Sequence, residues 1–164
     1  MTASHRAPAV ILLLAAAAAL GGALASERWL DLRPCALCLW ERWPYRLAIV
    51  LALLALLLPR RAMRGLLGLA AVAMLAGGML AAVHVGVEQR WWPSPLPECA
   101  APAMGGGSIA DRLARMPATP SKPCDEPAFL LPGLPVSMAA MNLGLSLALA
   151  GFLAMSILHQ RGSR

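Results

Sequence analysis

Four cysteines are the residues of this chain best suited to chemistry, and they form two pairs of different spacing. Cys35 and Cys38 make a C-x-x-C motif, whereas Cys99 and Cys124 lie 25 positions apart. Two sulfurs at C-x-x-C spacing can close a small disulfide ring, and this spacing often lowers the pKa of one thiol. All four lie outside the apolar stretches, and an even number indicates pairing in an oxidising compartment. The pattern favours redox cycling at Cys35 and Cys38.

Two other uses of the same residues stay open at this point. A structural zinc site usually has two close cysteine pairs, and the wide spacing of Cys99 and Cys124 argues against one, so no metal site is expected. Plain structural disulfides are the second alternative. A C-x-x-C bridge closes too small a loop to constrain the unfolded chain much, while a bridge between Cys99 and Cys124 would brace a long loop. Spacing alone leaves the pairing of the four cysteines open.

Arg42 is the candidate partner of the C-x-x-C motif. Arg42 follows Cys38 by one helical turn, so the two share a face if the segment is helical. Its guanidinium could stabilise negative charge on an acceptor oxygen, or it could simply anchor the chain at a membrane interface. His84 lies near the outer end of an apolar stretch, where a histidine often has a capping or interfacial role. Pro44 disfavours helical geometry at Trp43, so a helix starting near residues 39–41 is allowed rather than required.

Four apolar stretches must position these residues, at about residues 8–25, 42–58, 65–87 and 138–158. The chain is 59% hydrophobic and 13% charged, whereas soluble proteins are about 45–50% and 25%. A membrane span needs about 20 apolar residues, and the second stretch reaches that length only by including residues 39–46. We therefore predict an all-α membrane protein, an antiparallel four-helix transmembrane bundle in one domain covering residues 1–164. Small residues are expected to allow close helix contacts, namely Gly68, Gly77, Gly78, Gly144 and Gly151.

The first apolar stretch has a second interpretation, as a cleavable signal peptide. His5 and Arg6 precede an apolar run that ends in Ala23-Leu24-Ala25 before Ser26, which is the order of features in such a peptide. The run is longer than most signal-peptide cores, so an uncleaved span is favoured.

Charge is distributed unevenly between the segments that flank these stretches. Six arginines and no acidic residue lie in the two termini and the turn at residues 59–64, whereas the other segments hold all eight acidic residues and eight basic ones. The excess of arginine on one side places the termini and this turn in the cytoplasm. Loops 26–41 and 88–137 then lie on the outer side of the membrane. Because the basic residues flank apolar stretches, the net charge of +6 does not indicate nucleic-acid binding.

The second outer loop holds ten of the fourteen prolines and the run Gly105-Gly106-Gly107. Within it, residues 108–116 predict one short helix, with Ser108 as the N-cap and Asp111 completing a capping box. Its apolar face suggests an interfacial helix on the outer leaflet, or packing against the rest of the loop.

Taken together, these features resemble the DsbB family, the disulfide-bond formation protein B of bacterial inner membranes. The similarity covers the whole chain. Its most specific matches are Pro34-Cys35-Ala36-Leu37-Cys38 followed by Glu41-Arg42, His84 with Gln89, and Trp92-Pro93-Ser94-Pro95 ahead of Cys99.

The resemblance implies a multi-pass inner-membrane oxidoreductase that reoxidises a DsbA-like periplasmic partner and reduces a quinone, either ubiquinone or menaquinone. It implies that the partner attacks Cys99, which is bonded to Cys124, and that Cys35 exchanges with this second pair. Cys38 would be the thiolate that meets the quinone ring, with Arg42 and, more weakly, His84 in the quinone site.

Two alternatives compete with this hypothesis. A non-catalytic assembly or structural protein could use disulfides only to brace its periplasmic loops. A vitamin K epoxide reductase-like protein also places a C-x-x-C motif near a quinone, but there the motif is expected late in the bundle rather than after the first span.

Overall fold

The computed structural model describes residues 3–99, 108–114, 122–130, 133 and 135–162, and these residues are almost entirely helical outside the loops. The elements are α1 (Ala3–Trp29), α2 (Ala36–Trp40), α3 (Arg42–Leu57), α4 (Arg60–Glu88), the 3-10 turn η1 (Pro97–Cys99), α5 (Ile109–Ala114) and α6 (Met138–Gly162). In this part of the chain the β structure is a single isolated bridge between Phe129 and Ser137.

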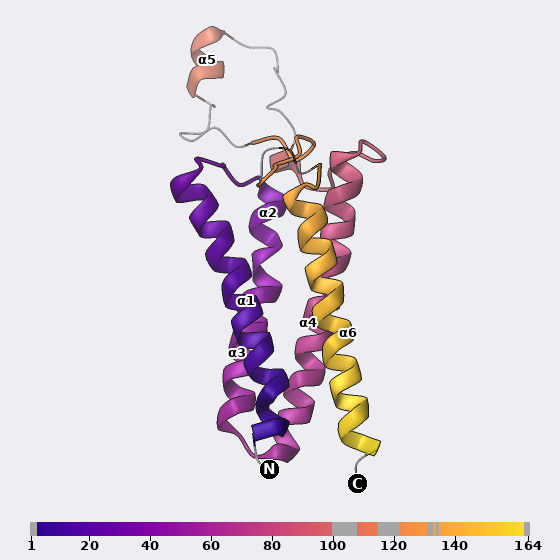
Figure 1. Cartoon of the computed structure of the whole chain (residues 1–164). Coiled ribbons are helices and arrows are strands. Elements are labelled where there is room, and N and C mark those ends of the chain that lie inside the picture. Colours follow the sequence, from indigo (N-terminus) through magenta and orange to yellow (C-terminus); the bar gives the residue numbers. More distant parts are fainter. Residues whose placement is uncertain (1–2, 100–107, 115–121, 131–132, 134, 163–164) are drawn as a thin grey trace.

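The four long helices lie side by side along one direction (Figure 1). α4 packs against both α3 and α6, α1 packs against α3, and α1 and α6 barely touch. Both termini and the α3–α4 turn lie at one end, which we call the arginine end because Arg60, Arg61 and Arg64 lie there. α2 and η1 lie at the opposite end, called the cysteine end.

The contact between the long helices depends on small residues at two adjacent positions of α4. A Cβ atom at Gly77 would lie 3.0 Å from Cβ of Pro44, and one at Gly78 would lie 3.1 Å from Cδ2 of Leu147. These two glycines therefore let α3 and α6 approach α4 closely, as predicted. The prediction was wrong for three others, which have open space where a side chain would be: Gly68, Gly144 and Gly151.

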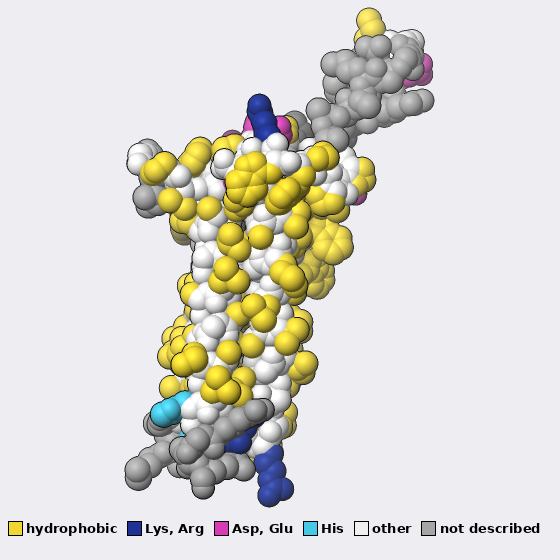
Figure 2. Space-filling model, turned by 90° about the vertical axis from the view of Figure 1, so that its right-hand side faces the viewer, with side chains coloured by type: hydrophobic (Ala, Val, Ile, Leu, Met, Phe, Trp, Pro, Cys, Tyr) yellow, Lys and Arg dark blue, Asp and Glu magenta, His cyan; other side chains and the backbone are white. Residues whose placement is uncertain are grey.

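Apolar side chains cover the outside of the long helices as well as their interior. Leu14, Val72, Met79 and Met155 are each more than 60% exposed. The face in Figure 2 carries hydrophobic side chains along its length, with the charged groups at its two ends. α1, α4 and α6 are long and apolar enough to cross a membrane. This exposed apolar surface is that of a membrane protein.

α3 is shorter than its neighbours. Its 16 residues give a length of about 24 Å at 1.5 Å per residue, less than the roughly 30 Å hydrocarbon core of a bilayer. α2 precedes it with only Glu41 between them. The two helices together extend this column up to the C-x-x-C motif.

The end of α4 turns the chain toward η1 through a Schellman motif. The N–H of Trp91 donates to the carbonyl of Gly86, and that of Arg90 donates to Val87. Arg90 has φ of 58°, a left-handed conformation usually taken by glycine. Trp92 then folds back onto Gly86, and its Nε1 donates to the carbonyl of Val83 at 3.1 Å.

The short helix predicted in the second loop is present as α5. Ser108 and Asp111 form the predicted capping box, with Ser108 Oγ accepting from the Asp111 N–H at 3.2 Å and Asp111 Oδ2 accepting from the Ser108 N–H at 3.2 Å. The described part of the helix ends at Ala114, so predicted residues 115–116 lie outside it. Figure 1 shows α5 beyond the cysteine end, apart from the long helices.

Candidate redox site

The C-x-x-C motif lies at the start of α2, where the backbone holds its two sulfurs together. Cys35 is the N-cap, and its Sγ accepts a hydrogen bond from the N–H of Cys38 at 3.1 Å. The two Sγ atoms are 2.6 Å apart in a pair of free thiols. The helix begins at Ala36, earlier than residues 39–41, because the capping sulfur satisfies an N–H that would otherwise lack a partner. Pro44 lies in the first turn of α3, where proline is tolerated.

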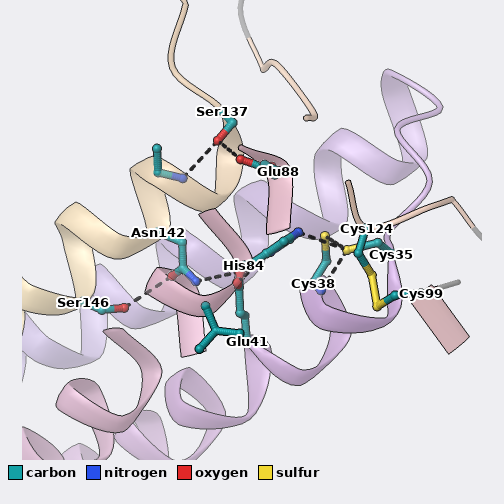
Figure 3. Close-up of polar contacts among 12 residues, drawn as sticks. Cys35, Cys38, Glu41, His84, Glu88, Cys99, Cys124, Ser137, Asn142 and Ser146 are labelled. Atoms are coloured by element: carbon teal, nitrogen blue, oxygen red, sulfur yellow. Dashed lines mark hydrogen bonds and ion pairs between the residues drawn. A yellow bond between two sulfur atoms is a disulfide. The ribbon is translucent and has the colours of Figure 1, made fainter. Parts of the chain in front are cut away.

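The ring of His84, from α4, points toward the two cysteines of the motif (Figure 3). Its Nε2 lies 3.5 Å from Cys35 Sγ, and its Nδ1 lies 2.8 Å from Oε1 of Glu41. The His84 and Glu41 residues are only 3% and 7% exposed. Glu41 is therefore a buried partner of His84 rather than a solvated group.

The Glu41 carboxylate is also held from α6. Its Oε2 accepts a hydrogen bond from Nδ2 of Asn142 at 2.8 Å, and Oδ1 of Asn142 accepts one from the hydroxyl of Tyr45 at 2.6 Å. The Tyr45 hydroxyl also lies 3.0 Å from Oγ of Ser146. Within the described residues, no buried side-chain polar atom lacks a partner. A fully paired buried network of this kind fixes the position of each member.

The two thiols of the motif differ in acidity. The hydrogen bond from Cys38 lowers the pKa of Cys35, against the opposing effect of burial. The same hydrogen bond, together with burial, raises the pKa of Cys38. Cys35 is therefore the more acidic of the two thiols, whereas the family resemblance implied a thiolate at Cys38. Cys38 must release its proton before it can donate electrons.

The second cysteine pair is present as a disulfide between Cys99 and Cys124. Both cysteines are buried, at 6% and 0% exposure. They pack in one cluster with Cys35, Leu37 and Val87, so the two pairs from separate loops meet at the cysteine end (Figure 3). The pairing that spacing left open is therefore Cys99 with Cys124.

A cavity of about 320 Å³, called here the Cys38 cavity, opens beside the motif. Cys38, Glu41 and Arg42 line it from the α2–α3 column, and apolar side chains of α1 and α6 line the other walls, including Ala19, Leu20, Ala23, Met138, Met141 and Leu145. Its volume is at the lower limit for small-molecule sites, about 300 Å³. His84 is not among the lining residues; its ring lies beside Cys35 instead.

Arg42 is paired with Glu27, a residue that the sequence interpretation placed in the first loop without a role. One guanidinium nitrogen of Arg42 donates to Oε1 of Glu27, and both residues line the Cys38 cavity. α1 continues to Trp29, which carries Glu27 on the helix rather than in the loop. One sequence signal could have predicted this ion pair. Glu27 is an acidic residue just past the first apolar stretch, level with Arg42.

Three donor atoms at this site are also close enough together to hold a metal ion. The ligand atoms of Cys35, Cys38 and His84 lie within 4.8 Å of one another. Two sulfurs and an imidazole suit a thiophilic ion such as Zn²⁺. Hydrogen bonds among the same three side chains already account for their proximity.

Comparison with known proteins gives two findings. The family model described as disulfide bond formation protein DsbB matches residues 5–156. An uncharacterized protein of Rickettsia prowazekii strain Madrid E is 28% identical over 156 residues, covering 94% of this chain and 89% of the relative. No solved structure matches the chain.

Proposed function

The chain belongs to the family of disulfide bond formation protein DsbB, and we propose that it reoxidises a DsbA-like dithiol partner and passes the electrons to a membrane quinone. The observation that carries this proposal is the position of Cys35. It packs in the cluster that contains the Cys99–Cys124 disulfide and lies 2.6 Å from Cys38, which lines the Cys38 cavity. A path for thiol–disulfide exchange thus leads from the second loop to the cavity.

Each cysteine has a distinct role in the proposed reaction. A partner thiolate attacks Cys99 and forms a mixed disulfide, which releases the Cys124 thiolate. The second thiolate of the partner displaces Cys99, so the partner leaves as a disulfide and the second pair is reduced. The reduced second pair then attacks Cys35 of a Cys35–Cys38 disulfide, which re-forms the Cys99–Cys124 disulfide and leaves Cys35 and Cys38 as two thiols carrying the two electrons. Cys35 and Cys38 then return to a disulfide, and the two electrons and two protons convert quinone to quinol.

The Cys38 cavity fits the ring of a quinone in the chemistry of its walls. One side offers a sulfur and a guanidinium, those of Cys38 and Arg42, and the others are largely apolar. A quinone bound there would supply the two-electron acceptor. Arg42 would stabilise negative charge on its oxygen, as preorganised cations do for oxyanions. The Arg42–Glu27 pair would orient the guanidinium at the cavity wall.

The proposed setting is the bacterial inner membrane, with α3 as a fourth span beside the three long apolar helices. The arginine end faces the cytoplasm, since arginine-rich turns are retained there. The cysteine end then faces the periplasm. Exposed tryptophans at that end fit an aromatic belt at the outer interface: Trp29, Trp40, Trp43 and Trp91. α5, with Ile109 77% exposed, would lie on the outer leaflet.

An absorbance assay of the purified protein tests this function. The protein is mixed with a reduced DsbA-type partner and with ubiquinone or menaquinone analogues, and quinol formation is followed. Catalytic quinol formation with matching oxidation of the partner is expected. If the four cysteines stay in fixed states when quinone is supplied and withdrawn, as shown by thiol trapping, the disulfides only brace the loops and the proposal fails.

A further inference from the structure

His84 and Glu41 link Cys35 to the Cys38 cavity by a route that does not pass through Cys38. His84 contacts Cys35 through Nε2, at 3.5 Å, and Glu41 through Nδ1, at 2.8 Å. Glu41 lines the cavity, whereas Cys35 and His84 do not. We propose that His84 and Glu41 form a proton relay that carries the Cys35 proton to the quinone in the cavity. This inference rests on the proposed function.

Proton balance explains why Cys35 needs such a relay. When the two thiols become a disulfide, two electrons and two protons leave the motif and are taken up by quinone as it becomes quinol. Cys38 lies on the cavity wall, so its proton has a direct way out. Cys35 is 3% exposed and does not line the Cys38 cavity, so its proton needs a carrier.

The transfers follow the hydrogen bonds already present. The S–H bond of Cys35 breaks and its proton goes to Nε2 of His84, while the proton on Nδ1 passes to Oε1 of Glu41. Glu41 then delivers a proton to the cavity. The lowered pKa of Cys35 agrees with easy loss of its proton. The sulfur left behind bonds to Cys38, and the imidazole ends neutral.

The surroundings of the relay favour this assignment. A carboxylate behind an imidazole sets its tautomer and stabilises the imidazolium. Asn142 holds the second Glu41 oxygen at 2.8 Å, so the carboxylate is fixed between His84 and the cavity. The other titratable groups near His84 are Cys38 and Glu88, and the Glu88 carboxylate accepts a hydrogen bond from Ser137 Oγ. Glu88 therefore lies outside the relay and serves as a matched control.

The first test uses the reduced protein without quinone. Thiolate absorbance at 240 nm is recorded against pH for the wild type, H84Q and E88Q. H84Q should shift the first ionisation step, that of Cys35, to higher pH because the proton acceptor is lost. E88Q removes a buried carboxylate from the same helix and should leave that step in place.

The second test measures quinol formation by the reduced variants. H84Q and E41Q should lower kcat about 100-fold, the lower range for loss of a general acid–base group, and E41D should restore part of it. H84Q should leave the KM for quinone unchanged, because His84 does not line the cavity. E88Q should behave as the wild type.

Two results would overturn the relay. One is an H84Q protein with the wild-type ionisation step and kcat. The other is an H84Q protein with raised KM and unchanged kcat, which would make His84 a quinone ligand instead. If the E41Q variant no longer forms the Cys99–Cys124 disulfide or no longer shows a thermal unfolding transition, it is misfolded. The H84Q variant alone then tests the relay. If the wild type forms no quinol at all, the proposed function is wrong. The absorbance measurement at 240 nm needs no quinone, so it still tests the contact between His84 and Cys35 in that case.

Discussion

Arg42 and Glu27 form an ion pair at the wall of the cavity that Cys38 also lines, joining the first turn of α3 to the end of α1. The pair orients the guanidinium, but it also places a carboxylate where negative charge would develop on a quinone oxygen. The E27Q variant should therefore lower the KM for quinone severalfold, by removing a competing anion. Steady-state quinol formation over a range of quinone concentrations measures this. A raised KM would mean that orientation by Glu27 matters more than its charge.

Removal of the Arg42 guanidinium should raise the KM for quinone rather than lower it. R42M keeps much of the aliphatic stem and loses the charge, and R46M, whose guanidinium lies over the Trp43 ring 5.1 Å from its centre, is the matched control. A hydrogen bond to a charged group is worth about 1.5–3 kcal/mol, so R42M should raise the KM for quinone at least about tenfold. R46M should change it little. Equal effects of the two variants would assign Arg42 to interfacial anchoring.

The two cysteines of the motif should differ in function. In C38S the sulfur on the cavity wall is lost, so quinone reduction should stop. The buried Cys99–Cys124 disulfide is unchanged in this variant, so a mixed disulfide between Cys99 and a single-cysteine partner should still be trapped on non-reducing gels. Continued quinone reduction by purified C38S protein would refute the assignment of Cys38.

The acidities of the two thiols predict a divided titration. In the reduced protein, the first thiolate should appear below the ordinary cysteine pKa of about 8.5, because the pKa of Cys35 is lowered. The second should appear far above it, because the pKa of Cys38 is raised. In C38A the hydrogen bond to Cys35 is lost, so the remaining step should shift to higher pH. Absorbance at 240 nm reports both ionisation steps. If the two thiols ionise together in one step, the difference in acidity between Cys35 and Cys38 is contradicted.

The close contact between Trp92 and Gly86 predicts an effect on stability. A Cβ atom at position 86 would lie 2.0 Å from Cζ2 of Trp92, so G86A must displace the indole ring and its hydrogen bond to Val83. A cost of about 1–3 kcal/mol is typical of such overpacking. G65A in the same helix meets no atom within 4 Å and should be neutral or slightly stabilising. Thermal unfolding in detergent, with tryptophan fluorescence, compares them.

The sequence predicted the parts of the fold that depend on local composition. The three apolar stretches around Leu14, Val72 and Met155 form long helices because each is continuously apolar over about 20 residues. The ends were less accurate, since apolar composition does not mark where a helix stops. α1 continues to Trp29 through polar residues that the sequence interpretation assigned to the loop.

Contacts between distant segments were beyond sequence reasoning. Glu41 meets His84, 43 positions on, and Asn142, 101 positions on. No pattern within one helix encodes such a meeting, which depends on how α3, α4 and α6 pack. The same limit explains why the prediction of close helix contacts was right for some glycines and wrong for others. Gly77 and Gly78 lie at helix contacts while Gly144 does not, although their local sequences are alike in character.

The burial of Cys99 and Cys124 has a consequence for selectivity. Because neither residue is more than 6% exposed, a small reductant such as glutathione finds almost no uncovered sulfur to attack in the resting disulfide. Only a protein that binds the loop and displaces its covering side chains could reach the bond. The Cys99–Cys124 disulfide would then be reduced only by a protein that recognises the loop, and small thiols in the surroundings would leave it oxidised.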